Sequence, residues 1–292
     1  MRFFLFSFLN LMFFVGVFAS NKYEVSVCAI FNNETPYLKE WIEYHRLIGV
    51  DHFYLYNNNS SDKPLNALVY YIKNKFVTLV DWPDYFGKLG EEKPFTWILG
   101  TKAAAFQHAI KLKNKETKWL VLLDINEFIL PVLGESLKDT VRKYDQYGGI
   151  ILKSDFFDAS SRKSFGEKKL VIQSDELILP PNQKIERIVE KMIFKPSLCQ
   201  QFSWPPFRCV LRPEEKVIEI STSEVRVNSY MNRTKNYSIS SKRGKIDLDP
   251  KIVSEKDKHL MLDAGYDVRE HSMERYVPEL MKKMGYTDSF TR

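Results

Sequence analysis

The chain has few cysteines, no glycine-rich nucleotide loop and no internal repeat. Its three cysteines form no Cys-x-x-Cys and no paired histidines accompany them, which disfavours a zinc site. No Gly-x-Gly-x-x-Gly follows the first predicted strand and no Walker loop occurs, which disfavours a dinucleotide oxidoreductase or an ATPase. The basic residues are scattered rather than striped, so the net charge of +6 does not indicate a nucleic-acid partner.

The sequence does have enough apolar residues for a substantial core. Hydrophobic residues make up 44% of the 292 and aromatic residues 14%, which predicts a globular protein of one large domain or two small ones. Cys28 lies in an apolar strand pattern and is expected to be a buried thiol. Cys199 and Cys209 flank an aromatic, proline-rich loop and could pair in an oxidising compartment, but their spacing alone does not decide this.

Residues 1–19 are expected to lie outside the fold. Arg2 precedes an apolar run at residues 3–18, and the small residues up to Ala19 are typical of a cleavable signal peptide. The run is at the short end for a spanning helix, so an uncleaved anchor that tethers the protein to a membrane is the alternative. In both cases the body is expected to be exported or to enter a secretory lumen.

Strand and helix patterns alternate through the first half of the chain. The predicted strands are residues 23–31, 52–56, 76–80 and 119–123, and the predicted helices are residues 37–48, 65–74 and 95–113. This alternation is the sequence form of a doubly wound sheet with right-handed crossovers. His45 follows Trp41 by one helical turn and is expected to be a structural histidine.

The second half is less regular. A predicted helix at residues 135–147 leads to a strand at 150–152 and then to residues 154–158, which we expect to form a polar and aromatic loop able to hold an acceptor sugar. A charged helix near the end carries an apolar face. That face consists of Tyr276, Leu280, Met281 and Met284.

The most informative stretch is residues 118–131. Its apolar run is typical of a strand buried in a parallel sheet, and Asp124, Asn126 and Glu127 follow at once. Ligands of open α/β sheets collect at such strand ends. Asp124 and Asn126 lie two apart, so in an extended segment both can offer oxygen ligands to Mn²⁺ or Mg²⁺ and to the diphosphate that it carries. The alternative is an ordinary turn that Asp124 caps.

Four segments, residues 27–34, 37–45, 49–62 and 118–129, occur together in one order. In this order they resemble glycosyltransferase family 92 and its bacterial relatives, which are family-2-like enzymes of the glycosyltransferase A (GT-A) fold. The likeness is firm over residues 23–131 and becomes scattered up to Gly244.

The resemblance implies an α/β fold of the GT-A type, a Rossmann-like doubly wound mixed sheet with a smaller irregular acceptor half. The implied domain covers residues 21–250. Its nucleotide-binding half is residues 21–131 and its acceptor half is residues 132–250. A charged helical C-terminal extension is expected at residues 251–292.

The resemblance also implies the activity and its participants. The expected reaction transfers a sugar from a nucleoside diphosphate donor, with a UDP-sugar favoured, to a saccharide acceptor, with inversion and with Mn²⁺ or Mg²⁺. The positions that correspond to the family's donor site are Asn33 and Glu34 beside the base, Asn57 and Asp62 in the loop near the ribose, and Asp124 and Asn126 at the metal-binding Asp-x-Asp motif, with Glu127 directly after it. Asp155 or Asp158 is expected to deprotonate the acceptor hydroxyl.

Three positions depart from the family pattern. Asn57 and Asn126 stand where the family has aspartate, and Ser229 stands where it has histidine. An amide binds a divalent cation more weakly than a carboxylate does, and a hydroxyl cannot replace an imidazole as a ligand. A weakened or inactive relative that binds carbohydrate or nucleotide as an interaction protein therefore stays an alternative. A metal-dependent nucleotidyltransferase or phosphohydrolase is a third.

Overall fold

The computed structural model describes most of the chain. The described residues are 21–83, 98–113, 115–134, 136–159, 170–178, 190–203, 208–231, 245–248, 262 and 267–286. The predicted leader at residues 1–19 lies outside them. No helix in the described ranges is long and apolar enough to cross a membrane.

The predicted alternation of strands and helices in the first half is confirmed, with ends shifted by a residue or two. In chain order the elements are β1 (Tyr23–Phe31), α1 (Thr35–Leu47), β2 (His52–Asn57), α2 (Leu65–Lys73), β3 (Val77–Asp81), the π-helical turn η1 (Ile98–Lys102), α4 (Ala103–Lys113) and β4 (Thr117–Leu122). The start of the helix predicted at residue 95 falls outside the described residues.

The second half adds strands of both directions. Its elements are β5 (Glu127–Pro131), α5 (Leu137–Lys143), β6 (Gly149–Asp158), the 3-10 turn η3 (Val171–Gln173), β7 (Leu177–Ile178), β8 (Glu190–Phe194), the 3-10 turn η5 (Pro196–Leu198), β9 (Cys199–Ser203), β10 (Arg208–Leu211), β11 (Val217–Glu219), β12 (Val225–Met231), β13 (Lys245–Leu248), β14 (Asp267–Glu270), the 3-10 turn η6 (Glu274–Tyr276) and α7 (Val277–Met284).

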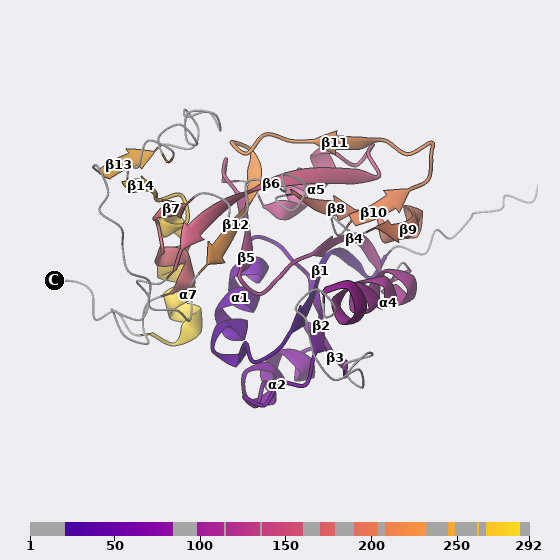
Figure 1. Ribbon diagram of the computed structural model, residues 1–292, viewed down its shortest axis with the longest axis horizontal. Helices are drawn as coiled ribbons and strands as arrows, with labels where there is room; N and C mark the ends of the chain where they lie inside the picture. The colour runs from indigo at the N-terminus through magenta and orange to yellow at the C-terminus, as the bar shows by residue number, and fades with distance from the viewer. Residues whose placement is uncertain are drawn as a thin grey trace, which may run out of the picture.

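One mixed sheet of ten strands organises the described residues (Figure 1). Its main path is β3-β2-β1-β4-β8-β6-β12-β5, and β7 and β11 pair with β6 off this path. The neighbours β3, β2, β1 and β4 are all parallel, whereas β8 runs antiparallel to both β4 and β6, and β5 runs antiparallel to β12. The predicted α/β class with a mixed sheet is therefore confirmed.

Apolar residues bury both faces of the central strands. In β1, Val25, Val27, Ala29 and Phe31 join one core cluster, and Cys28 and Ile30 join the other. This division follows from the two-residue period of a strand. Residues of α1 belong to the first cluster and residues of α4 to the second, so the two helices cover opposite faces.

The prediction of a loop at residues 154–158 is wrong, because these residues form the second half of β6. They pair in parallel with β12, in a register that runs from Val227 opposite Ser154 to Met231 opposite Asp158. A polar sequence in a buried strand is stable when its polar groups find partners inside the protein. Asp155 finds one, because its carboxylate oxygen lies 3.1 Å from Nε of the fully buried Arg226.

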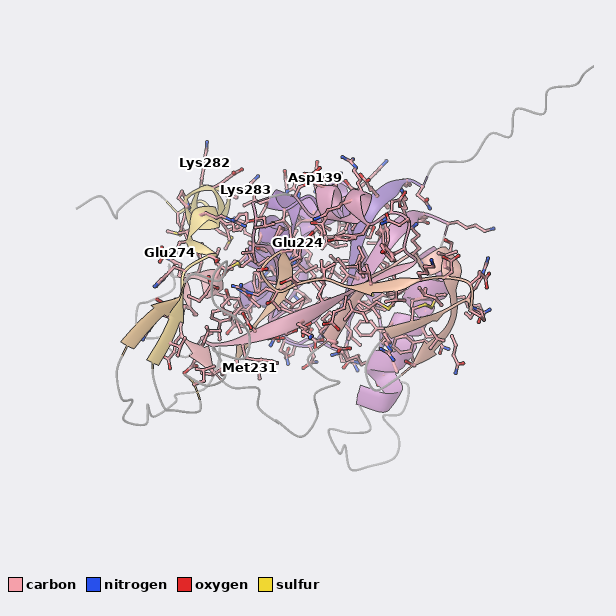
Figure 2. All side chains as sticks on the ribbon, turned by 90° about the horizontal axis from the view of Figure 1, so that it is seen from above. Asp139, Glu224, Met231, Glu274, Lys282 and Lys283 are labelled. Atoms are coloured by element: carbon pink, nitrogen blue, oxygen red, sulfur yellow. A yellow bond between two sulfur atoms is a disulfide. The ribbon has the colours of Figure 1, made fainter. Side chains whose placement is uncertain are left out.

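The C-terminal residues 267–286 pack against the body of the protein. Val268, Met273 and Leu280 are buried in the same core cluster as α1, and the other predicted apolar positions of the last helix are partly buried against it. The Arg275 guanidinium donates to the carbonyl oxygen of Val132 at 2.9 Å. Figure 2 shows Glu274, Lys282 and Lys283 on this segment beside the sheet. The predicted start of an extension at residue 251 lies outside the described residues.

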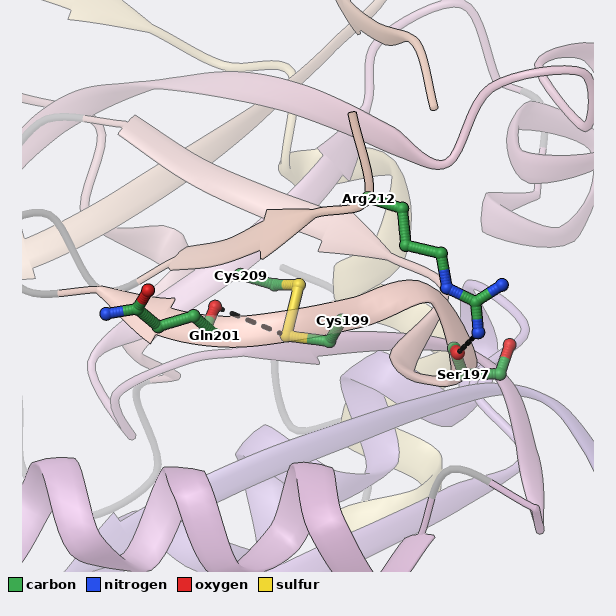
Figure 3. Close-up of a disulfide and its surroundings, with 5 residues drawn as sticks. All are labelled: Ser197, Cys199, Gln201, Cys209 and Arg212. Atoms are coloured by element: carbon green, nitrogen blue, oxygen red, sulfur yellow. Dashed lines mark hydrogen bonds between the residues drawn. A yellow bond between two sulfur atoms is a disulfide. The ribbon is translucent and has the colours of Figure 1, made fainter. Parts of the chain in front are cut away.

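A disulfide joins Cys199 and Cys209 across the antiparallel pair β9 and β10 (Figure 3). Their Cα atoms are 5.5 Å apart, within the range that a disulfide requires. The pairing that the spacing left open is thus present. Cys28 is free and fully buried, as predicted, and burial raises the pKa of its thiol.

Candidate functional site

The polar residues predicted to bind the donor meet at one edge of the sheet. Because β1, β2, β3 and β4 are neighbours and all parallel, their carboxyl ends lie side by side (Figure 1). Residues 32–34 follow β1, residues 58–62 follow β2, Trp82 follows β3 and residues 123–126 follow β4. The sheet topology therefore brings segments far apart in the sequence to a single edge.

The loops after β1 and β2 are joined by asparagine side chains. Asn33 has a φ of 55°, a left-handed conformation that asparagine tolerates better than most residues. Its Oδ1 accepts a hydrogen bond from the backbone of Ser61 at 2.8 Å, and its own backbone donates to Ser60 Oγ at 3.0 Å. Asn57 accepts from the backbone of Ser60 at 3.2 Å and donates to Asp81 at 3.3 Å. Asn33 and Asn57 thus belong to one network.

Asp62 and Glu34 lie at the start of α1. Asp62 Oδ2 accepts from the backbone N–H of Thr35, the first residue of the helix, at 2.8 Å. Glu34 holds the N-cap position, but its side chain makes no capping hydrogen bond, so the β2 loop supplies the cap instead. Asp62 therefore has a structural role, and its predicted contact with a ribose stays a prediction.

Asp124 and Glu127 close the turn between β4 and β5. The backbone N–H of Asp124 donates to Glu127 Oε2 at 2.8 Å. The Asp124 carboxylate faces Lys102, whose Nζ lies 2.5 Å from Asp124 Oδ1. Lys102 comes from the π-helical turn η1, an irregularity that is frequent at functional sites. The Asp124 side chain is about one-third exposed, at 34%, whereas the Lys102 side chain is 10% exposed, so the carboxylate of this ion pair reaches the surface and the lysine lies behind it.

Glu127 lies deeper and has its own cation. Its Oε2 is 2.7 Å from Nζ of Lys191 on β8, and the Ser229 hydroxyl lies 3.5 Å from its Oε1. Burial raises the pKa of the Glu127 carboxyl, an effect that the Lys191 ammonium opposes and the Asp124 carboxylate reinforces. Burial alone would lower the pKa of Lys191, but Glu127 and Asp124 raise it overall.

Asn126 ties the turn to the end of β12. Its side-chain Nδ2 donates to the backbone carbonyl of Tyr230 at 3.3 Å, and its backbone carbonyl accepts from the backbone N–H of Tyr230 at 2.8 Å. An aspartate here would place a carboxylate oxygen against the Tyr230 carbonyl, and the two acceptors would repel each other. This contact is a physical reason for the amide at a position where the resemblance leads one to expect a carboxylate.

The side chains of this turn do not fit the expected Mn²⁺ or Mg²⁺. Both carboxylates are paired with lysines, and the described ranges contain no group of three or more His, Cys, Asp or Glu that could hold a metal ion. The Lys102 and Lys191 ammonium groups already balance the two carboxylates, so a divalent ion at this turn would meet no uncompensated negative charge. We therefore assign no chemical step to a metal ion.

The two aspartates predicted as the base lie in different surroundings. Asp158 ends β6 opposite Met231, whose sulfur is 3.8 Å from Nδ2 of Asn126. Met231 is the last residue of β12, and Glu224 lies just before the other end of the strand (Figure 2). Asp155 lies three residues earlier, about 10 Å along the strand, and is paired with Arg226. The structure thus places Asp158, rather than Asp155, at the end of β6, separated from the acidic turn by the end of β12.

Nothing in the sequence marks the cations of the site. Lys102 falls inside the helix predicted at residues 95–113, and Lys191 lies in the less regular second half of the chain. Neither has a spacing that marks it as functional. Lys191 reaches Glu127 only in the folded sheet. The one sequence signal for such a cation was the presence of carboxylates next to an apolar run, since a buried carboxylate needs a cationic partner.

Comparisons with known proteins agree on one family. Residues 21–260 match the family model described as Glycosyltransferase family 92. A family 92 protein of Ricinus communis is 27% identical over 134 residues, which are 46% of this chain and 22% of that protein. A family 92 protein of Arabidopsis thaliana is 32% identical over 108 residues, or 37% of this chain and 16% of that protein. The chain thus aligns with about a fifth of each relative's length.

Solved structures show a weaker likeness. The crystal structure of residues 1–349 of S. aureus TarS in complex with UDP is 17% identical, covers 60% of this chain and 47% of that chain, and gives a TM-score of 0.35. A score this low carries no argument, so the fold class rests on the strand order described above.

Proposed function

Because this chain belongs to glycosyltransferase family 92, we propose that it transfers a sugar from a nucleoside diphosphate donor to a saccharide acceptor. The observation that carries the proposal is the match over residues 21–260, which includes the four neighbouring parallel strands β1 to β4 and the acidic turn after β4. We favour a UDP-sugar as the donor and inversion at the anomeric carbon.

The arrangement of polar groups supports a donor site at the carboxyl edge of the parallel strands. The network of Asn33 and Asn57 would border the base and ribose, because it joins the loops after β1 and β2. Asp124 and its neighbours would border the diphosphate, because they follow β4, on the other side of β1 from β2. Crevices at this edge are the usual ligand sites of open α/β sheets.

The proposed chemistry is a single displacement. Asp158 takes the proton of the acceptor hydroxyl as that oxygen forms a bond to the anomeric carbon. The bond from the anomeric carbon to the diphosphate oxygen breaks, and the nucleoside diphosphate leaves with that electron pair. Asp158 is the better candidate for the base because it ends β6 opposite Met231, whereas Asp155 lies within the strand in a buried ion pair with Arg226.

A second candidate function is a silent relative that binds carbohydrate or nucleotide as an interaction protein. The observation that favours it is the neutral Asn126, whose amide is used to join the turn to β12 rather than left for a cation. In this case donor binding would persist without turnover.

We also propose that the protein works in an oxidising compartment, as an exported or secretory-lumen protein or as one tethered to a membrane. The disulfide between Cys199 and Cys209 supports this location, because such bonds persist mainly outside the cytosol.

The test is release of nucleoside diphosphate from a panel of nucleotide sugars, with and without a mixture of oligosaccharides. We expect release that rises when acceptor is added. Asp158→Asn should lower the turnover by about 10²–10⁴-fold and leave the donor affinity unchanged. Asp175→Asn is the matched control, because this aspartate pairs with Arg269 in the C-terminal part of the fold.

Three other results would contradict the proposal. Binding of UDP or sugar without turnover on any donor of the panel would favour the silent relative. Release of pyrophosphate or of free phosphate would indicate a nucleotidyltransferase or a phosphohydrolase. Full activity of Asp158→Asn would show that Asp158 is not the base.

A further inference from the structure

We infer that the Lys102 ammonium, with Lys191 behind it, takes the place of a divalent cation against the donor diphosphate, so that donor binding does not require metal. This inference rests on the proposed function, because it concerns the same site. It follows from the ion pairs Lys102–Asp124 and Lys191–Glu127 and from the amide at position 126.

The charges of the site balance in the same way with two lysines as with one metal ion. A site of two carboxylates, one divalent cation and a diphosphate has the net charge of the diphosphate alone. Asp124, Glu127, Lys102 and Lys191 with a diphosphate and no metal give the same net charge, since the two ammonium groups carry as much positive charge as one divalent ion. The four side chains are neutral together, so no divalent ion is needed to cancel the charge of the two carboxylates.

The two lysines have different positions and therefore different roles. The Lys191–Glu127 pair is buried, with side chains 13% and 8% exposed, so Lys191 acts through the field of its charge and keeps Glu127 paired. The Lys102 side chain is also buried, at 10% exposed, but its partner Asp124 is 34% exposed at the edge where ligands collect. Because its partner reaches the surface, Lys102 is the lysine nearer to this edge, where it can act as a charge-assisted hydrogen-bond donor to phosphate oxygens.

Asp124 becomes a positioning residue in this arrangement. Its carboxylate holds the Lys102 ammonium and also repels an incoming diphosphate. If Asp124 were instead a metal ligand, its removal would abolish metal-dependent binding. The two roles predict opposite results for one substitution, Asp124→Asn.

The experiment is calorimetric titration of the full chain with UDP, in EDTA and again with Mn²⁺. The variants are Lys102→Met, Lys102→Arg and Asp124→Asn. Lys118→Met is the control, because Lys118 lies near the opposite end of β4 and pairs with Asp145 at the surface. Circular dichroism of each variant verifies that it is folded.

We expect wild-type UDP binding of equal affinity in both buffers. Lys102→Met should weaken it by about tenfold to a hundredfold, as loss of a charge-assisted hydrogen bond does, and Lys102→Arg should restore most of the loss. Asp124→Asn should keep the affinity within a few-fold of the wild type or tighten it.

Binding that appears only with Mn²⁺ and is lost in Asp124→Asn would overturn the inference and leave the proposed function standing. Affinities unchanged in folded Lys102→Met would also overturn it. If neither UDP nor any other nucleoside diphosphate binds in either buffer, the proposed function itself fails, and the inference fails with it.

Discussion

Lys191→Met should be strongly destabilising, because it removes the ammonium that pairs with the buried Glu127 carboxylate. The Lys191 ammonium lies 2.7 Å from Glu127, and the two side chains are 13% and 8% exposed. Breaking a buried ion pair by removing one partner typically costs about 3–5 kcal/mol, since the other charge stays buried without compensation. We therefore expect the free energy of unfolding at neutral pH to fall by about 3–5 kcal/mol.

Two further variants separate the ion pair from other effects. Lys153→Met removes a lysine that pairs with Glu219 at 2.6 Å, but there the side chains are 45% and 49% exposed, so the expected loss is at most about 1 kcal/mol. Combining Lys191→Met with Glu127→Gln removes both charges, and this double variant should recover a large part of the loss.

The loss in Lys191→Met should also depend on pH. Burial already raises the pKa of Glu127, and without the opposing ammonium that pKa must rise further. A group with a raised pKa in the folded state stabilises the fold below its unfolded pKa, and this stability is lost as the pH rises through the folded pKa. The deficit should therefore grow with pH, by up to about 1.4 kcal/mol per pH unit.

The measurement is urea unfolding followed by tryptophan fluorescence, repeated between about pH 5.5 and 8 for the wild type and the three variants. A loss in Lys191→Met as small as that in Lys153→Met, with no dependence on pH, would refute the buried ion pair. Failure of the double variant to recover would show that packing, rather than charge, dominates.

Two other predictions concern stability. Burial lowers the pKa of His45 to about 3. The stability that the neutral imidazole contributes should therefore be fully present above about pH 6.5, and the free energy of unfolding should fall by up to about 1.4 kcal/mol per pH unit as the pH drops toward 3. His45→Gln should lack this dependence in urea unfolding, and an unchanged dependence would contradict a neutral, buried imidazole. Replacing Cys199 and Cys209 by serine opens a loop closed over a separation of 10 residues, so unfolding should become easier by about 3 kcal/mol. Thermal melts with and without reductant check this, and a reductant effect that persists in the double variant would refute it.

Much of the parallel half of the fold was predictable because its signals are local. The period of apolar residues in 23–31 and 37–48 gives a strand and a helix without knowledge of their neighbours, and the structure has them as β1 and α1. His45 was expected to be structural, and it is fully buried with its Nδ1 2.8 Å from the Trp41 carbonyl. Because parallel strands share a carboxyl edge, the chain order alone also indicated where polar side chains would gather.

Features that depend on contacts between distant parts of the chain could not be predicted from the sequence. The polarity of residues 154–158 indicated a loop, but pairing with β12 and the ion pair of Asp155 with Arg226 make a buried strand of it. The cysteines gave no pairing from their spacing, whereas the hairpin of β9 and β10 sets Cys199 and Cys209 at bonding distance.

The acidic turn shows most clearly which features the sequence determines and which only the tertiary structure decides. The sequence by itself determined that Asp124, Asn126 and Glu127 follow a buried strand, because a strand and the residues next to it are covalently fixed. The tertiary structure alone decided which cations face them, since Lys102 and Lys191 arrive from η1 and β8, on either side of the turn in the chain. The chemistry of charged groups depends on neighbours within a few ångströms, and folding rather than chain order sets those distances.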